Sequence, residues 1–155
     1  MKKVVLLIYG EGGHRQEMKL LLEHIDTGTL DFISVGPAPL DESIRHVSLM
    51  DVRDKNKHSN LITLLIRNLS CLPMLYKIVK KYGVSGAIST GPGNAILPFI
   101  LLRLLGKKTV FVETFCRFYT RSITGRVMYR IASDFYVQNK EQLVFYKNAK
   151  YSGRL

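Results

Sequence analysis

Short apolar runs alternate with helical patterns along this chain, and this alternation restricts the possible fold more than any other feature. Residues 4–9 form the first run, and residues 15–25 follow it with apolar side chains at helical spacing. A continuous apolar run without alternating polar positions is typical of a parallel strand that is covered on both faces. Strands that alternate with helices predict an α/β fold with a doubly wound, mostly parallel sheet and right-handed connections.

The rest of the chain continues the same pattern. Further strands are expected at residues 31–35, 84–89, 108–113 and 134–138, and helices at residues 60–82, 94–105, 125–132 and 141–146. Pro73 should kink or split the second helix, and Gly83 should end it. Residues 37–60 are polar and irregular, with a short strand near Val47 as an option. A chain of 155 residues fits one domain, so residues 1–155 are predicted to form a single Rossmann-like domain.

Neither the N-terminus nor the cysteines indicate export. The first apolar run has only six residues, fewer than a signal peptide or a membrane-spanning helix requires. Cys71 and Cys116 lie far apart and in no metal or redox spacing, which favours a reduced, cytoplasmic protein. We expect no metal site and no cofactor.

The positive charge is concentrated in the second half of the chain. Lys and Arg number 23 against 12 acidic residues, a net charge of +11. Residues 84–155 carry 11 basic and 3 acidic groups, whereas residues 1–83 carry 12 and 9. Such a field favours an anionic partner, which can be a nucleic acid, a phospholipid surface or a phosphorylated substrate.

Two glycine-rich loops follow predicted strands. The first contains Gly12 and Gly13, and the second contains Gly91, Gly93 and Asn94. Ligands of doubly wound sheets bind beyond the carboxyl ends of the strands, where glycine lets the backbone approach and a helix N-terminus attracts phosphate. We therefore predict a phosphate or diphosphate ligand, although tight turns also use glycine for steric reasons. Arg15 stands where a dinucleotide-binding loop needs its third glycine.

Two apolar segments bear on membrane contact. Residues 61–79 are interrupted by Arg67, Pro73 and Lys77, and residues 96–105 contain Arg103. These charges argue against a membrane-spanning helix. Both segments can be helices buried against the sheet, but apolar surface beside clustered Lys and Arg also suits peripheral contact with anionic lipid.

The order of the motifs resembles one known family over nearly the whole chain. The motifs begin at Gly10, Ser89, Gly106 and Val112, and read GEGGHxxEM, STGPG, GKK and VETFxR. They resemble the small non-catalytic subunit of the dolichol-pathway N-acetylglucosaminyltransferase and its bacterial capsule and exopolysaccharide counterparts, the PssD-like proteins. More distantly, the pattern is similar to the N-terminal domain of MurG, a transferase that acts on a lipid-diphosphate sugar.

This resemblance implies the acceptor-side half of a GT-B glycosyltransferase. The chain would be inactive alone, and would bind a lipid-diphosphate-linked acceptor and recruit a separate donor-binding subunit, with which it would form a heterodimer. The UDP-sugar would bind to that partner, and the pair would transfer a hexosyl or N-acetylhexosaminyl group at the inner face of the cell membrane. The product would be a capsular polysaccharide, an exopolysaccharide or a lipid-linked oligosaccharide.

The resemblance also implies roles for particular residues. Both glycine loops and Arg117 would face the acceptor diphosphate, although Glu11 departs from the family pattern and would repel a phosphate if it pointed inward. His14 and Glu113 are the catalytic candidates. A neutral His14 at a helix start can accept a proton, or it can be a capping residue. Glu113 can orient the acceptor or act as the base, or it can form an ion pair with Arg117 or Arg121.

The sequence also permits other functions. The basic charge also suits a nucleic-acid-binding module, but no exposed aromatic residues interleave with it in a known RNA-binding pattern, so no nucleic acid is expected. A stand-alone small-molecule enzyme of doubly wound fold is a further alternative. Aromatic and apolar residues near the C-terminus can form the core of an interface with the partner, or can pack on the protein's own sheet; they are Phe145, Tyr146, Tyr151 and Leu155.

Overall fold

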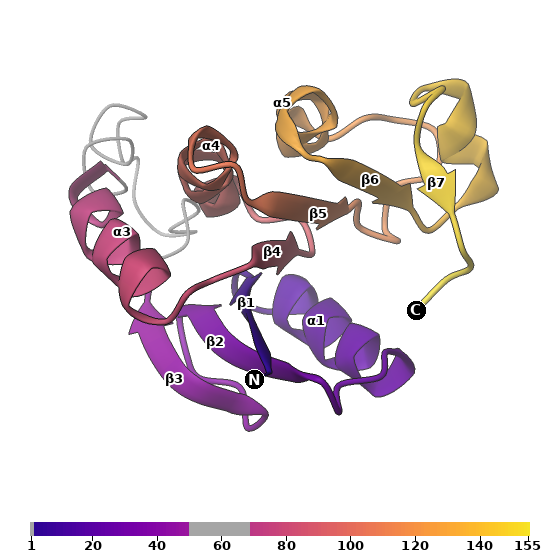
Figure 1. The fold of residues 1–155 in the computed structure, drawn as a ribbon. Coiled ribbons are helices and arrows are strands. Elements are labelled where there is room, and N and C mark those ends of the chain that lie inside the picture. Colours follow the sequence, from indigo (N-terminus) through magenta and orange to yellow (C-terminus); the bar gives the residue numbers. More distant parts are fainter. Residues whose placement is uncertain (1, 50–68) are drawn as a thin grey trace.

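The computed structural model describes residues 2–49 and 69–155, and the strands in these ranges form one parallel sheet (Figure 1). The sheet has seven strands in the order β3-β2-β1-β4-β5-β6-β7, and each neighbouring pair is parallel. The strands are β1 (Lys3–Ile8), β2 (Leu30–Gly36), β3 (Ser43–Ser48), β4 (Gly86–Ser89), β5 (Lys108–Val112), β6 (Asp134–Val137) and β7 (Lys150–Tyr151). The prediction of a doubly wound parallel sheet is confirmed.

Helices cover both faces of this sheet (Figure 1). One face carries α1 (Gly13–His24), and the other carries α3 (Leu72–Lys81), α4 (Ile96–Leu104) and α5 (Ile123–Ile131). Two short 3-10 helices complete the described elements, η1 (Gly93–Ala95) and η2 (Lys140–Val144). The helices that connect parallel strands run back from the carboxyl edge of the sheet, whereas β2 and β3 are joined by a loop without a helix.

The first strand shows why its sequence is apolar without alternation. Leu6 and Ile8 are fully buried in the cluster beneath α3, α4 and α5. Leu7 is equally buried, but it belongs to the cluster that includes Met18 and Leu22 of α1. Successive side chains of a strand point to opposite faces, so a strand covered on both faces needs apolar residues at every position.

Most predicted boundaries agree with the structure to within about two residues. The strand near Val47 is confirmed as β3, and Gly83 follows α3 as expected. The predicted helix at residues 60–82 lies partly outside the described residues; Pro73 occupies the first turn of α3, just after a turn at Cys71. The final predicted helix is the 3-10 helix η2. We did not predict β7, which has only two residues, both exposed.

The strand order reverses between β1 and β4, which are neighbours in the sheet although β2 and β3 separate them in sequence. The helices that follow these two strands, α1 and α4, lie on opposite faces of the sheet. In doubly wound folds, ligands bind at the carboxyl edge at such a reversal. Both glycine-rich loops lie at this point. In the described ranges, no helix combines the length and hydrophobicity needed to cross a bilayer.

The close approach of β4 to β5 generates a prediction about stability. A Cβ atom at Gly86 would lie 2.5 Å from the backbone carbonyl oxygen of Lys108, and neither strand can move without disturbing the sheet. We expect Gly86→Ala to lower the free energy of unfolding by about 1–3 kcal/mol. The matched control is Gly13→Ala, since no atom lies within 4 Å of its added methyl group. Equal urea midpoints for the two variants would contradict this packing argument.

Candidate functional site

The first glycine loop leads directly into helix α1. Gly12 is the N-cap residue and has a φ of 62° and a ψ of −122°, a backbone conformation open only to glycine. Gly12, Gly13 and Glu11 are exposed at the carboxyl edge of the sheet. The backbone N–H groups of the first helical turn therefore lie at this edge, and they carry the positive end of the helix dipole.

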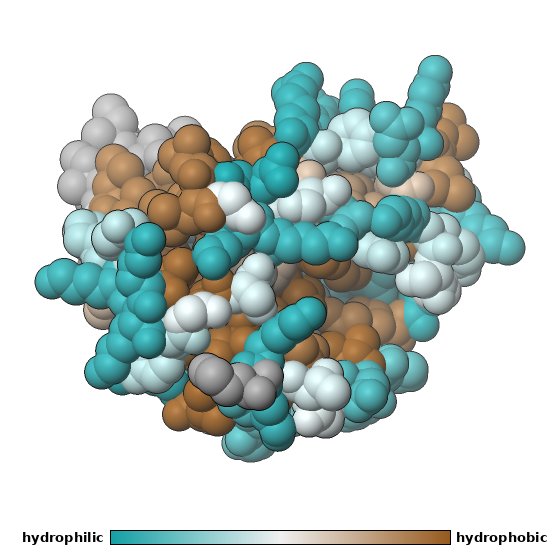
Figure 2. Space-filling view, in the orientation of Figure 1, coloured by the Kyte–Doolittle hydropathy of each residue, from teal (hydrophilic) through white to brown (hydrophobic). Residues whose placement is uncertain are grey.

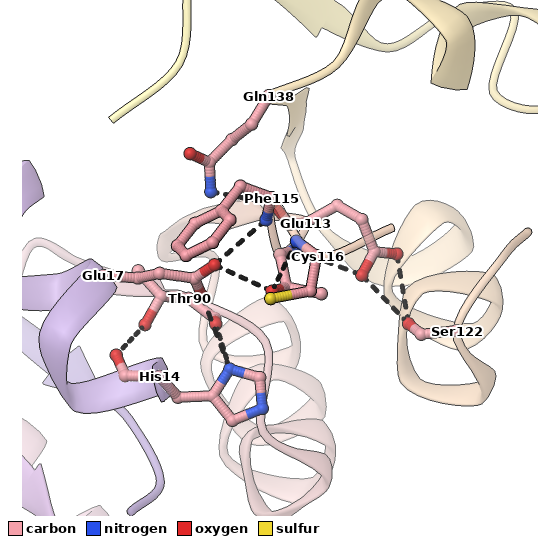
Figure 3. Close-up of polar contacts among 9 residues, drawn as sticks. His14, Glu17, Thr90, Glu113, Phe115, Cys116, Ser122 and Gln138 are labelled. Atoms are coloured by element: carbon pink, nitrogen blue, oxygen red, sulfur yellow. Dashed lines mark hydrogen bonds and ion pairs between the residues drawn. The ribbon is translucent and has the colours of Figure 1, made fainter. Parts of the chain in front are cut away.

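Hydrogen bonds join this loop to the second glycine loop. The His14 ring nitrogen Nδ1 lies 2.7 Å from the carbonyl oxygen of Thr90, and the Thr90 hydroxyl donates to the carbonyl oxygen of His14 at 2.7 Å. Figure 3 shows both contacts. Because a carbonyl oxygen can only accept, His14 Nδ1 carries the hydrogen, and Nε2 is the acceptor nitrogen of the neutral ring.

Gly91 explains how the imidazole can lie so close to this loop. Its φ is +115°, and a Cβ atom there would lie 2.8 Å from Cε1 of His14. The absence of a side chain at Gly91 thus makes room for the His14 ring. Gly93 begins η1, and Asn94 is buried in the same short helix. The second loop therefore packs against His14, one of the two catalytic candidates.

Glu17 is a site residue to which we assigned no role from the sequence. It is 1% exposed, and its Oε1 accepts hydrogen bonds from the Thr114 hydroxyl at 2.7 Å and from the Phe115 amide at 3.0 Å. Its other oxygen lies 3.5 Å from His14 Nδ1. Glu17 therefore links α1 to the loop after β5 (Figure 3). Its position three residues after His14 places both side chains on one helix face, and this spacing was the available signal.

Glu113 lies at the same edge, directly after β5, but its carboxylate turns away from His14 (Figure 3). The Ser122 hydroxyl lies within hydrogen-bond distance of both carboxylate oxygens, at 3.0 and 3.1 Å, and the Tyr146 hydroxyl donates to Oε2 at 3.0 Å. Glu113 is 1% exposed, and burial raises the pKa of its carboxyl group despite these hydrogen bonds.

The Glu113 carboxylate does not have the arginine partners that the sequence suggested. Among the described residues, neither Arg117 nor Arg121 forms an ion pair with this carboxylate, and hydroxyl groups take that place. Gly125 leaves room for the Glu113 carboxylate, because a Cβ atom at position 125 would overlap it. Ser122 also caps α5 by accepting a hydrogen bond from the Gly125 amide at 2.7 Å. The ion-pair alternative is wrong.

The remaining predicted residues have plain positions. Arg117 is exposed on the loop after β5, where its guanidinium donates to the Thr120 hydroxyl at 3.2 Å. Asn139 holds that loop by donating to the carbonyl oxygens of Phe115 and Arg117, at 2.8 and 2.6 Å. Across residues 2–49 and 69–155, no three His, Cys, Asp or Glu side chains are grouped so that they could hold a metal ion.

The C-terminal aromatic residues separate into two groups. Tyr146 is fully buried and packs against the rings of Phe135 and Tyr129, with centroids 4.7 and 5.1 Å apart. Phe145 and Tyr151 are 36% and 39% exposed. Packing on the protein's own sheet is therefore correct for Tyr146, and the exposed pair remains available to a partner.

Solved structures with a similar fold include MurG and a UDP-N-acetylglucosamine 2-epimerase. MurG from Acinetobacter baumannii aligns with 100% of this chain at a TM-score of 0.68 and 15% identity. A UDP-N-acetylglucosamine 2-epimerase from Rickettsia bellii aligns with 99% of it at a TM-score of 0.70 and 10% identity. The aligned region spans 44% and 45% of those two proteins. At these identities the likeness shows the fold alone, a Rossmann-like domain of the GT-B type.

Sequence relatives are more specific. The chain is 30% identical to the UDP-N-acetylglucosamine transferase subunit alg14 of Schizosaccharomyces pombe, over 98% of this chain and 83% of that protein. It is 23% identical to the human subunit ALG14, over 97% of this chain and 82% of that protein. Residues 44–155 match the family model described as "Oligosaccharide biosynthesis protein Alg14 like". The chain therefore belongs to the Alg14-like family of oligosaccharide biosynthesis proteins.

Proposed function

We propose that this protein is the acceptor-binding subunit of a two-component glycosyltransferase that makes a lipid-linked oligosaccharide or a surface polysaccharide. One observation carries the proposal: the two glycine loops, joined through His14 and Thr90, lie at the strand-order reversal of a GT-B-type domain. The names of the relatives, which are subunits of a UDP-N-acetylglucosamine transferase, support the reaction class.

The edge where the two glycine loops meet suits the diphosphate of a lipid-linked acceptor. The N-terminus of α1 offers backbone N–H groups at Gly12 and Gly13, and the loop through Gly91 and Gly93 lies opposite. Arg117 is exposed on the next loop of the same edge and can pair with a phosphate oxygen. Asn94 would support the second loop from below, because its side chain is buried.

His14 is the better placed of the two catalytic candidates. With Nδ1–H held by the Thr90 carbonyl, Nε2 of the neutral ring can take the proton from an acceptor hydroxyl. That oxygen then bonds to the anomeric carbon of the donor sugar as the bond between this carbon and the UDP oxygen breaks. The side chain of His14 is 31% exposed, so a substrate can reach the ring.

Glu113 suits a positioning role in this proposal. Its carboxylate is buried against the start of α5 and holds Ser122 and Tyr146, which lie 9 and 33 residues further along the chain. These contacts fix where the loop after β5 begins and ends, and that loop carries Arg117 and meets Glu17. Glu113 would therefore act on the acceptor through the shape of this loop.

The donor sugar would bind to a separate subunit. Support comes from the relatives, each of which is named as a subunit of its transferase. The exposed Phe145 and Tyr151 near the C-terminus offer aromatic surface for such a heterodimer. We further propose that the pair works at the inner face of the cell membrane, where a lipid-linked acceptor is available.

The role of His14 can be tested in the assembled pair. We expect His14→Ala to lower the rate of sugar transfer by about 100–10,000-fold, because proton transfer to a positioned base contributes that much. The matched control is His24→Ala, which removes an exposed imidazole from the other end of α1. Wild-type rates for His14→Ala in the presence of saturating acceptor would exclude it as the base.

The buried position of Glu113 predicts a dependence of stability on pH. Because its pKa is raised in the folded protein, the carboxyl group favours folding when protonated, and this contribution is lost as the pH rises from about 4.3 through the raised value. The difference in unfolding free energy between wild type and Glu113→Gln should therefore fall with pH over this range, by at most about 1.4 kcal/mol per pH unit. Urea unfolding of both proteins measures it, and a pH-independent difference would contradict the assignment.

The proposal that the donor sugar binds to a separate subunit can be tested on the chain alone. Titration calorimetry should detect weak or no binding of a UDP-sugar to the isolated 155-residue chain, and no transfer should occur. Co-expression with a donor-binding subunit should give a stable complex that transfers sugar to a lipid-linked acceptor. Tight binding of a UDP-sugar by the isolated chain would overturn the proposal.

A further inference from the structure

Glu17 is a buried acid of which only one carboxylate oxygen accepts hydrogen bonds. Hydrophilic side chains project from the surface of the molecule, where charged groups are normally found (Figure 2). Glu17, by contrast, is 1% exposed. Its Oε1 accepts hydrogen bonds from the Thr114 hydroxyl and the Phe115 amide, but Oε2, which is also buried, accepts none from the described residues. Because such an oxygen is costly to bury, it indicates a role beyond holding the loop.

The His14 ring lies beside this second oxygen. Its Nδ1 is 3.5 Å from Oε2 of Glu17, and it donates its hydrogen to the Thr90 carbonyl oxygen at 2.7 Å. Figure 3 shows the Glu17 carboxylate between the ring and the loop after β5. The longer distance is no hydrogen bond to a neutral ring, but two opposite charges attract strongly at such a separation. Oε2 therefore faces the place where positive charge develops when His14 takes a proton.

The helix dipole makes such a partner useful. His14 is the second residue of α1 (Gly13–His24). The positive end of the dipole disfavours a positively charged ring at this position and so weakens His14 as a base. Glu17 is three residues further along and lies on the same helix face. Since its carboxylate is buried, water screens its attraction for the ring little, and this attraction opposes the effect of the dipole.

We propose that Glu17 is the positioning residue of the base, and that its carboxylate orients His14 and stabilises the imidazolium formed during sugar transfer. The inference rests on the proposed function, in which His14 is the base. Nε2 takes the proton of the acceptor hydroxyl, and the hydroxyl oxygen bonds to the anomeric carbon. The bond from that carbon to the UDP oxygen breaks, and its electron pair leaves with UDP. The positive ring then faces Glu17 through Nδ1–H.

The other charged groups around the ring have different contacts or lie in solvent. Arg15 of α1 donates to a backbone carbonyl oxygen in the loop after β2, and Arg117 donates to a hydroxyl group of its own loop. Glu11 is exposed, and the carboxylate of Glu113 turns away (Figure 3). Residues 90–94 contain no ionisable side chain. The buried carboxylate on α1 is therefore the charge that water screens least.

Glu17→Gln separates the proposed role from a purely structural one. The two hydrogen bonds to Oε1 tie α1 to the loop after β5, and they need only an acceptor oxygen. Glutamine supplies this oxygen and has the same size, so the substitution removes the charge and leaves the link. A melting temperature near that of wild type should confirm that the fold is intact.

Nitrogen-15 NMR of the full chain measures the effect on the ring without a partner subunit. The His14 signals, identified by their loss in His14→Ala, should titrate at a lower pH in Glu17→Gln, by about one pH unit or more. Glu17→Asp keeps the charge but moves it away from the ring, so its midpoint should lie between the two. A purely structural role predicts the reverse order, since Asp changes the shape more. The matched control is Glu23→Gln, which removes an exposed carboxylate from the same helix and should leave the midpoint unchanged.

A double-mutant cycle in the assembled pair tests whether Glu17 acts through His14. Glu17→Gln should lower kcat for sugar transfer by about 100–1,000-fold with little change in KM, because the charge is needed only when the ring is protonated. In a His14→Ala background the same substitution should cause almost no further loss, since no ring remains to be stabilised. The Glu23→Gln control should transfer sugar at the wild-type rate.

The outcomes distinguish this inference from the proposed function. An equal loss of kcat in both backgrounds, or a His14 midpoint that Glu17→Gln leaves unchanged, would refute the inference while the transferase activity of the wild-type pair stands. Wild-type kcat for His14→Ala would refute it too, together with the assignment of the base. If the wild-type pair transfers no sugar, the proposed function fails, and the midpoints of the isolated chain still decide whether Glu17 stabilises the charged ring.

Discussion

The reciprocal hydrogen bonds between His14 and Thr90 are the contact on which the candidate site depends. They cross the point where the strand order reverses, and so connect the first helix to a loop 76 residues further along the chain. Glycine at position 91 allows this contact, since a side chain there would collide with the imidazole. The same contact places the hydrogen on Nδ1 of His14 and ties the two glycine loops together.

Two buried carboxylates extend this arrangement to the loop after β5. Glu17 holds the start of the loop from α1, and Glu113 holds its end through Ser122 and Tyr146. Burying a carboxylate is costly unless hydrogen bonds compensate, and each of these acids accepts at least two. The loop carrying Arg117 is therefore positioned by polar contacts at both ends, which suits the proposed contact of Arg117 with a phosphate.

The membership in the Alg14-like family and the surface charge fit one another. In the proposed function, the protein needs an edge that can bind phosphate and a position at the membrane. In this fold the helices begin at the edge of the sheet where doubly wound folds bind ligands. The stretch from residue 69 to residue 133, whose single acidic residue is the buried Glu113, contains the second glycine loop, the loop after β5 and the helices α3, α4 and α5.

The sequence by itself determined the fold class, and it placed both glycine-rich loops at one edge of the sheet. Apolar runs such as residues 4–9 report burial on both faces, and a loop after a parallel strand has only one edge to occupy. Only the tertiary structure decided which groups meet at that edge. Glu17 and Tyr146 lie far in sequence from the groups they contact, and Glu113 turns toward α5 because Gly125 leaves room there. Local patterns record burial and backbone conformation, whereas side-chain partners depend on how distant segments pack, and no spacing along one chain encodes that directly.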